Sequence, residues 1–155
     1  MVVIGFDPGS ISFGLGILKL EDKRILFLHA EEIKLKEKDF YNRMKSLWIR
    51  LTEIYAGFPI QQAAIEEGFL GKDVRAMSTL AKVRGLVTAS LIDRNIPLGS
   101  YSPRQVKLAL SGSGSAPKPQ LGKILRMILD IRDREFGNDE SDALAVAYCH
   151  ALHIR

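Results

Sequence analysis

The strongest constraint on the fold is the way the chain begins, with the apolar run VVIGFD followed at once by Pro8 and Gly9. An uninterrupted apolar run of this length, closed by a turn signal, predicts a strand buried on both faces. Asp7 therefore stands at the end of a buried strand, and the Pro-Gly pair turns the chain away from it. Taken alone, Asp7 is as compatible with a turn residue as with a functional carboxylate.

The next segments predict an α/β fold built on a sheet. The stretches FGLGILKL and RILFLHAEEIKL predict two more strands, and the short connection Glu21–Lys23 makes the first three strands an antiparallel meander. Apolar spacings of three and four predict an amphipathic helix from Asp39 to Phe58. QQAAIEE and LGSY predict a fourth and a fifth strand.

The rest of the chain predicts mainly helices. They are expected at Asp73–Asn95, from Pro103 through RQVKLAL, at Gln120–Asp130 and from Asn138 to the C-terminus. The segment Ser111–Pro119, rich in Gly, Ser and Pro and without periodicity, predicts a flexible loop. At 155 residues, with no long linker, residues 1–155 are expected to form one domain.

Composition excludes several classes of protein. No apolar run approaches the roughly 18 residues that span a bilayer, so no membrane partner is expected. The N-terminus lacks the pattern of a signal peptide, which predicts a cytoplasmic protein. Cys149 is the only cysteine, so it is expected to be a buried thiol rather than part of a disulfide framework. The three histidines lack zinc-ligand spacing.

The charge is distributed unevenly along the chain. Between Gly68 and Leu129 ten basic and two acidic residues give a net charge of +8, which leaves −4 for the remainder of a chain whose total is +4. A basic half beside an acidic half suggests a surface for a polyanion. A solvated helix face with excess Lys and Arg is the plainer alternative.

Carboxylates stand at two further places where a site is expected. Glu66 and Glu67 stand at the end of the predicted fourth strand, while Asp139 and Asp142 share one face at the start of the last helix. A helix cap and a dipole partner would explain the two aspartates separately. If the first and fourth strands are neighbours, however, the acids converge, and such a cluster must protonate or bind a cation. Oxygen ligands alone select Mg²⁺ or Mn²⁺.

Four successive blocks of the sequence resemble one known family. The blocks IGFDPGSISFGLGIL, AIEEGFLGKDVRAMSTLAKVRG, YSPRQVKLALSGSGSAPKPQ and NDESDALAVAYCHA are similar to those of RuvC, the bacterial crossover junction endodeoxyribonuclease. Their order and spacing match over almost the whole chain. The resemblance implies a ribonuclease H-like fold and a homodimer that nicks opposed strands of a four-way (Holliday) DNA junction.

The resemblance also implies roles for individual residues. Asp7, Glu66, Asp139 and Asp142 match the four catalytic acids, which would hold two Mg²⁺ or Mn²⁺ ions. Lys107 and Lys118 match basic positions near the scissile phosphate, although the Pro-Lys-Pro sequence around Lys118 departs from the usual family pattern. The aromatic that contacts bases near the crossover corresponds to Phe69. The candidate DNA contacts are then Phe69, Lys72, Arg75, Arg84, Arg104, Lys107 and Lys118.

The resemblance names partners as well. Junction DNA and a second copy of the chain are expected, with the helix Asp73–Asn95 as a candidate dimer interface. The RuvA–RuvB branch-migration complex is a further candidate partner. Three alternatives stay open: a junction-binding module without catalysis, a ribonuclease H-like nuclease acting on RNA or RNA–DNA hybrids, and an actin-like ATPase. The last is disfavoured because 155 residues leave no room for a second lobe.

Overall fold

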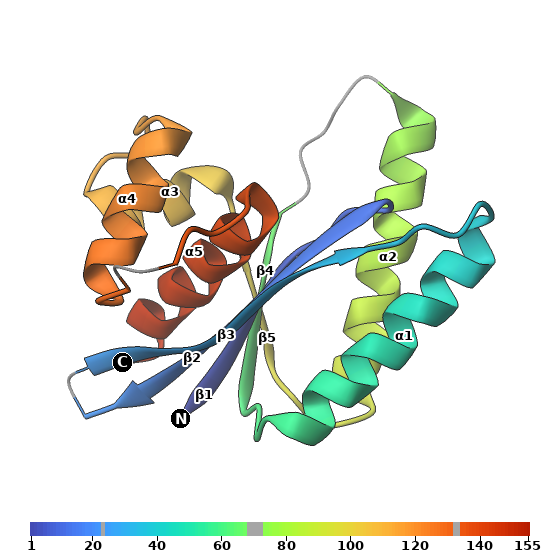
Figure 1. The fold of residues 1–155 in the computed structure, drawn as a ribbon, viewed down its shortest axis with the longest axis horizontal. Helices are drawn as coiled ribbons and strands as arrows, with labels where there is room; N and C mark the ends of the chain where they lie inside the picture. The colour runs from blue at the N-terminus through green and yellow to red at the C-terminus, as the bar shows by residue number, and fades with distance from the viewer. Residues whose placement is uncertain (23, 68–72, 132–133) are drawn as a thin grey trace.

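The computed structural model describes residues 1–22, 24–67, 73–131 and 134–155. It contains a five-stranded mixed sheet of order β3-β2-β1-β4-β5 (Figure 1). The expected fold class and the antiparallel start of the sheet are confirmed, with β4 parallel to β1 and β5 parallel to β4. The strands are β1 (Val2–Asp7), β2 (Ser12–Glu21), β3 (Arg24–Lys34), β4 (Gln62–Glu66) and β5 (Leu98–Tyr101).

Helices cover both faces of the sheet. Two long helices, α1 (Phe40–Gly57) and α2 (Val74–Ile92), pack on one face (Figure 1). The other face carries α3 (Pro103–Ser111), α4 (Lys118–Ile128) and α5 (Asn138–His153). Every helix and strand expected from the sequence is therefore present, in the expected order.

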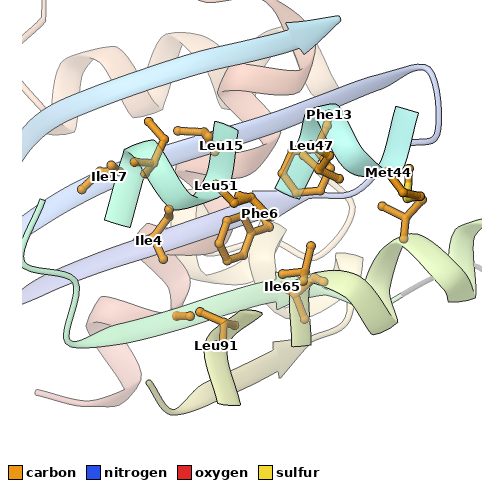
Figure 2. Packing of buried hydrophobic residues seen from close by; sticks show 14 of the residues in the cluster. Ile4, Phe6, Phe13, Leu15, Ile17, Met44, Leu47, Leu51, Ile65 and Leu91 are labelled. Carbon is orange, nitrogen blue, oxygen red and sulfur yellow. The ribbon is translucent and has the colours of Figure 1, made fainter. Parts of the chain in front are cut away.

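Side chains that alternate along the strands build the core under α1 and α2. Figure 2 shows Ile4 and Phe6 of β1 facing Leu47 and Leu51 of α1, with Phe13 of β2 beside them. All five side chains are fully buried. Because successive strand residues point to opposite faces, the residues between them, including Asp7, face α5.

Glycines let α5 lie unusually close to the sheet. A Cβ added at Gly5 would lie 2.2 Å from the carbonyl oxygen of Ala143, and one at Gly14 would lie 2.1 Å from that of Asp139. Any larger residue would push the helix away. The glycines of β1 and β2 therefore hold the N-terminal half of α5 against the strand ends that carry the acids.

One expected boundary on this face is wrong. Lys118, expected in the loop Ser111–Pro119, is the first residue of α4, because proline is well tolerated in the first turn of a helix, where no N–H partner is needed. The last helix, α5, begins at Asn138 as expected, but Asp139 is not its N-cap. Gly137 holds that position, and its N–H donates to the Glu140 carboxylate at 2.8 Å.

The remaining sequence expectations concern the thiol and membrane segments. Cys149 is fully buried, and burial raises the pKa of its thiol to about 11. Among the helices of the described residues, none has the length and apolarity needed to cross a membrane.

Candidate active site

Two of the predicted acids lie side by side at the edge of the sheet. β1 and β4 run parallel, with Phe6 paired to Ile65, so the next residues of each strand, Asp7 and Glu66, are neighbours. Both stand on the face covered by α5, because they follow residues that point into the opposite core. The first and fourth strands are thus neighbours, which is the condition under which the sequence predicted that these acids meet.

The first turns of α5 bring two more carboxylates to this edge. Asp139 and Asp142 are three residues apart and so share one face of the helix. Together with Asp7 and Glu66 they line a recess of about 630 Å³. Its walls come from α3, α4 and α5, and the lining includes Val106, Lys107, Leu110, Lys118, Leu121, Leu125, Arg126, Phe136, Asn138 and Ser141.

The pKa of Asp7 is raised by its position in this cluster. Burial, and then the charges of Asp142, Asp139 and Glu66, raise the pKa of Asp7 from 3.8 to about 7. Only Lys118 acts in the opposite direction among these causes. A half-buried carboxylate with three like charges nearby is unfavourable unless a proton or a cation compensates it.

Glu66 shows the same effect in weaker form. Burial, and then Asp142, raise the pKa of this carboxyl group, while Lys118, Lys107 and Arg84 oppose the shift. Burial is the first cause of the raised pKa at both Asp7 and Glu66, and the charge of Asp142 adds to it at each. Carboxylates with raised pKa values in a recess mark a candidate functional site.

Lys118 occupies the mouth of the recess. Its Nζ donates to Asp142 Oδ2 at 2.6 Å, and this hydrogen bond raises the pKa of the lysine. The side chain is 70% exposed, so the ion pair stands at the solvent boundary. An ammonium group thus lies among the carboxylates, where a positive charge is needed most.

The Asp139 carboxylate accepts a hydrogen bond from a residue of the sheet. Ser12, the first residue of β2, donates a hydrogen bond from Oγ to Asp139 Oδ2. Ser12 Oγ also lies 2.8 Å from Glu32 Oε1 of β3. Ser12 and Glu32 were not identified as site residues from the sequence. The one pattern that pointed to Ser12 is its alternation with Gly14 and Gly16, which places all three on the face of β2 that α5 covers.

The predicted basic residues are spread over a wider area. Lys107 lines the recess, whereas Arg104 packs against Gly114 outside it. Arg84 is half-buried and donates to the backbone carbonyl of Glu66, so it supports the end of β4. Arg75 lies exposed in the first turn of α2. The predicted contacts Phe69 and Lys72 lie outside the described residues.

The donor set suits a hard cation, although the side chains do not yet converge on one point. Across the described residues, no three His, Cys, Asp or Glu side chains are arranged to hold an ion together. Asp142 is paired with Lys118, and Asp139 is hydrogen-bonded to Ser12. Every candidate ligand is a carboxylate oxygen, which matches Mg²⁺ or Mn²⁺, and Lys118 already places one positive charge there.

The sheet order and the position of the acids define the class of protein, a nuclease with the ribonuclease H-like fold. The family model for the crossover junction endodeoxyribonuclease RuvC matches residues 3–150. The chain therefore belongs to the RuvC family of crossover junction endodeoxyribonucleases, which are metal-dependent phosphodiester hydrolases.

The sequences of individual RuvC proteins align with nearly the whole of this chain. The RuvC proteins of Christiangramia forsetii and Polynucleobacter necessarius are 34% and 35% identical to it. The alignments cover 96% and 98% of this chain and 78% and 89% of the relatives. The solved structure of Thermus thermophilus RuvC in complex with a Holliday junction substrate has 30% identity and a TM-score of 0.93. That comparison covers 100% of this chain and 95% of the other.

Proposed function

We propose that this protein resolves four-way (Holliday) DNA junctions by hydrolysing phosphodiester bonds at the recess beside Asp7. The observation that carries the proposal is that four carboxylates, from β1, β4 and α5, line one recess together with two lysines. A phosphate-binding module without catalysis gains nothing from four acids that repel its ligand. Residues 1–155 would act as one catalytic domain.

The acids divide into two sets by their position. Asp7 and Glu66 stand on rigid strand ends, and Asp139 and Asp142 stand on the first turns of α5. We assign all four as ligands of Mg²⁺ or Mn²⁺, with Asp7 central because the three other charges all act on it. Two bound ions would supply an activated water and charge stabilisation at the leaving oxygen, giving 5′-phosphate and 3′-hydroxyl ends.

The two lysines face the same recess from different helices. Lys118 comes from the first turn of α4, and Lys107 comes from α3. Both charges act on Glu66, so both lie within electrostatic range of the strand end. We propose that both lysines stabilise the negative charge that develops on the phosphate during cleavage.

The proposed function is tested by substrate choice. The wild-type protein is incubated with a synthetic four-way junction, the matching linear duplex and an RNA–DNA hybrid, in Mg²⁺ or in EDTA. Paired nicks in the junction alone, and only with the metal, are expected. Cleavage of the hybrid in preference to the junction would instead support the second candidate, a nuclease of RNA or hybrids. Junction binding without cleavage would support a binding module.

The exposed face of α2 supports the predicted homodimer. Val74 and Ile92 are 76% and 70% exposed, although the helix also buries a full apolar face against the sheet. One exposed stripe between them carries only small, uncharged residues, with the exposed Arg75 and Lys82 beside it, so two such helices can approach closely along this stripe. This outer face of α2 consists of Val74, Ser78, Ala81, Gly85, Ala89 and Ile92. A RuvA–RuvB complex as partner stays a prediction.

Gly85→Glu tests the dimer without disturbing the monomer. A Cβ at Gly85 meets nothing within 4 Å, so the isolated chain accommodates the side chain. In a two-fold interface the carboxylates of both copies would meet, and we expect the dimer to weaken by more than about a hundredfold. Sedimentation over a concentration series measures this. Gly57→Glu, at another glycine with open space around it, is the matched control. A monomeric wild-type protein, or an unchanged Gly85→Glu dimer, would refute this interface.

A further inference from the structure

We infer that Ser12 is a positioning residue of the active site, which fixes the Asp139 carboxylate through its hydroxyl group. This inference rests on the proposed function, because it assigns Asp139 to the metal-binding cluster. Ser12 is remote from Asp139 in sequence, and the contact joins the start of β2 to the first turn of α5. The acid is thus held by a residue of the sheet rather than of its own helix.

The close packing of α5 makes this contact possible. Ser12 and Gly14 lie on the same face of β2, and a Cβ at Gly14 would overlap the backbone of Asp139. The helix therefore sits so low over β2 that the short serine side chain spans the remaining gap. Since the strand backbone is rigid, the hydroxyl can fix the orientation of the carboxylate.

Glu32 competes for the same hydroxyl hydrogen. It pairs with Gly14 across the β2–β3 ladder, and its Oε1 lies 2.8 Å from Ser12 Oγ. A serine hydroxyl has only one hydrogen to donate. Glu32 has a second partner in the Lys34 ammonium group, 3.8 Å from its Oε2. The Ser12 hydroxyl therefore lies between the carboxylates of Glu32 and Asp139.

Metal affinity in the absence of DNA tests this role. Binding of Mn²⁺ is measured by calorimetry for the wild type and for Ser12→Ala, and thermal unfolding verifies that the variant is folded. Loss of a hydrogen-bonding partner of a metal ligand lowers affinity by about 10–100-fold, and we expect Ser12→Ala to fall in this range. Ser12→Thr keeps the hydroxyl and is expected to restore binding. Ser46→Ala removes a hydroxyl that donates to Glu37, near α1 on the other face, and is the matched control.

A second variant separates the hydroxyl from the charge of Glu32. The amide of Glu32→Gln can donate to Ser12 Oγ, so the hydroxyl hydrogen stays with Asp139 and Mn²⁺ affinity is expected to equal or exceed that of the wild type. Wild-type affinity in folded Ser12→Ala, or an equal loss in Glu32→Gln, would overturn the inference. If the wild type binds Mn²⁺ but does not nick junctions, the proposed function fails instead. The two failures are therefore distinguishable.

Discussion

Asp7→Asn should abolish junction nicking while leaving junction binding intact. The substitution keeps the size and shape of the side chain but removes the charge on which Asp142, Asp139 and Glu66 act. Loss of an outer partner of a metal ligand already lowers activity by about 10–100-fold, so loss of the central ligand should lower nicking by more than about a hundredfold. Gel-based nicking of a labelled four-way junction in Mg²⁺ measures the effect.

The Asp7→Asn variant should keep its affinity for the junction although it no longer nicks it. Junction affinity depends on the basic surface, and removing one acid from the recess takes away repulsion against phosphate. We therefore expect mobility-shift assays in EDTA to give an affinity at least equal to that of the wild type. An Asp7→Asn protein that still nicks junctions in Mg²⁺ would contradict the assignment of Asp7.

The neighbouring pair Glu66 and Glu67 provides a matched comparison. Glu66 ends β4 and lines the recess, whereas Glu67 is the next residue and lies exposed. Glu66→Gln should lose nicking as Asp7→Asn does, and Glu67→Gln should keep it. Equal losses in both variants would mean that the charge of the strand end, rather than one ligand, supports the reaction.

Local patterns were sufficient to predict the elements of this fold, whereas the ribonuclease H-like arrangement of the sheet was implied by the resemblance to RuvC. The apolar runs and the three-and-four spacings predicted all strands and helices, because each element buries a face whose periodicity is visible in the sequence. The start of α4 was wrong because Gly, Ser and Pro before Lys118 predict a loop, while proline in a first helical turn is also compatible with a helix. Local composition does not distinguish these two outcomes.

The candidate site was predictable only in part. Asp7 and Glu66 end strands, so their meeting follows once β1 and β4 are neighbours. The Lys118–Asp142 ion pair and the Ser12–Asp139 hydrogen bond depend instead on how closely α4 and α5 approach the sheet. That distance is set by Gly5, Gly14 and Gly16 meeting the backbone or side chains of α5. No local pattern encodes such a contact.

In the metal-free protein, Asp7 should contribute a loss of stability as pH rises from about 4 to about 7. The pKa of Asp7 is raised from 3.8 to about 7 in the folded state, so within this window the folded protein binds more protons than the unfolded chain. The free energy of unfolding therefore decreases with pH. A shift of about three pH units corresponds to about 4 kcal/mol as an upper limit. Glu66, whose pKa is also raised, acts in the same direction.

Asp7→Asn should remove most of this pH dependence. Near pH 4 the wild type carries a neutral Asp7 and the two proteins should be equally stable, whereas at pH 8 the variant should be more stable by about 2–4 kcal/mol. Urea unfolding in EDTA at several pH values measures the difference. Saturating Mn²⁺ should reverse the order, because the ion stabilises only the protein that binds it. Equal stabilities at pH 8 without metal would show that Asp7 does not hold uncompensated charge, and the electrostatic argument for a cation at this site would fail with it.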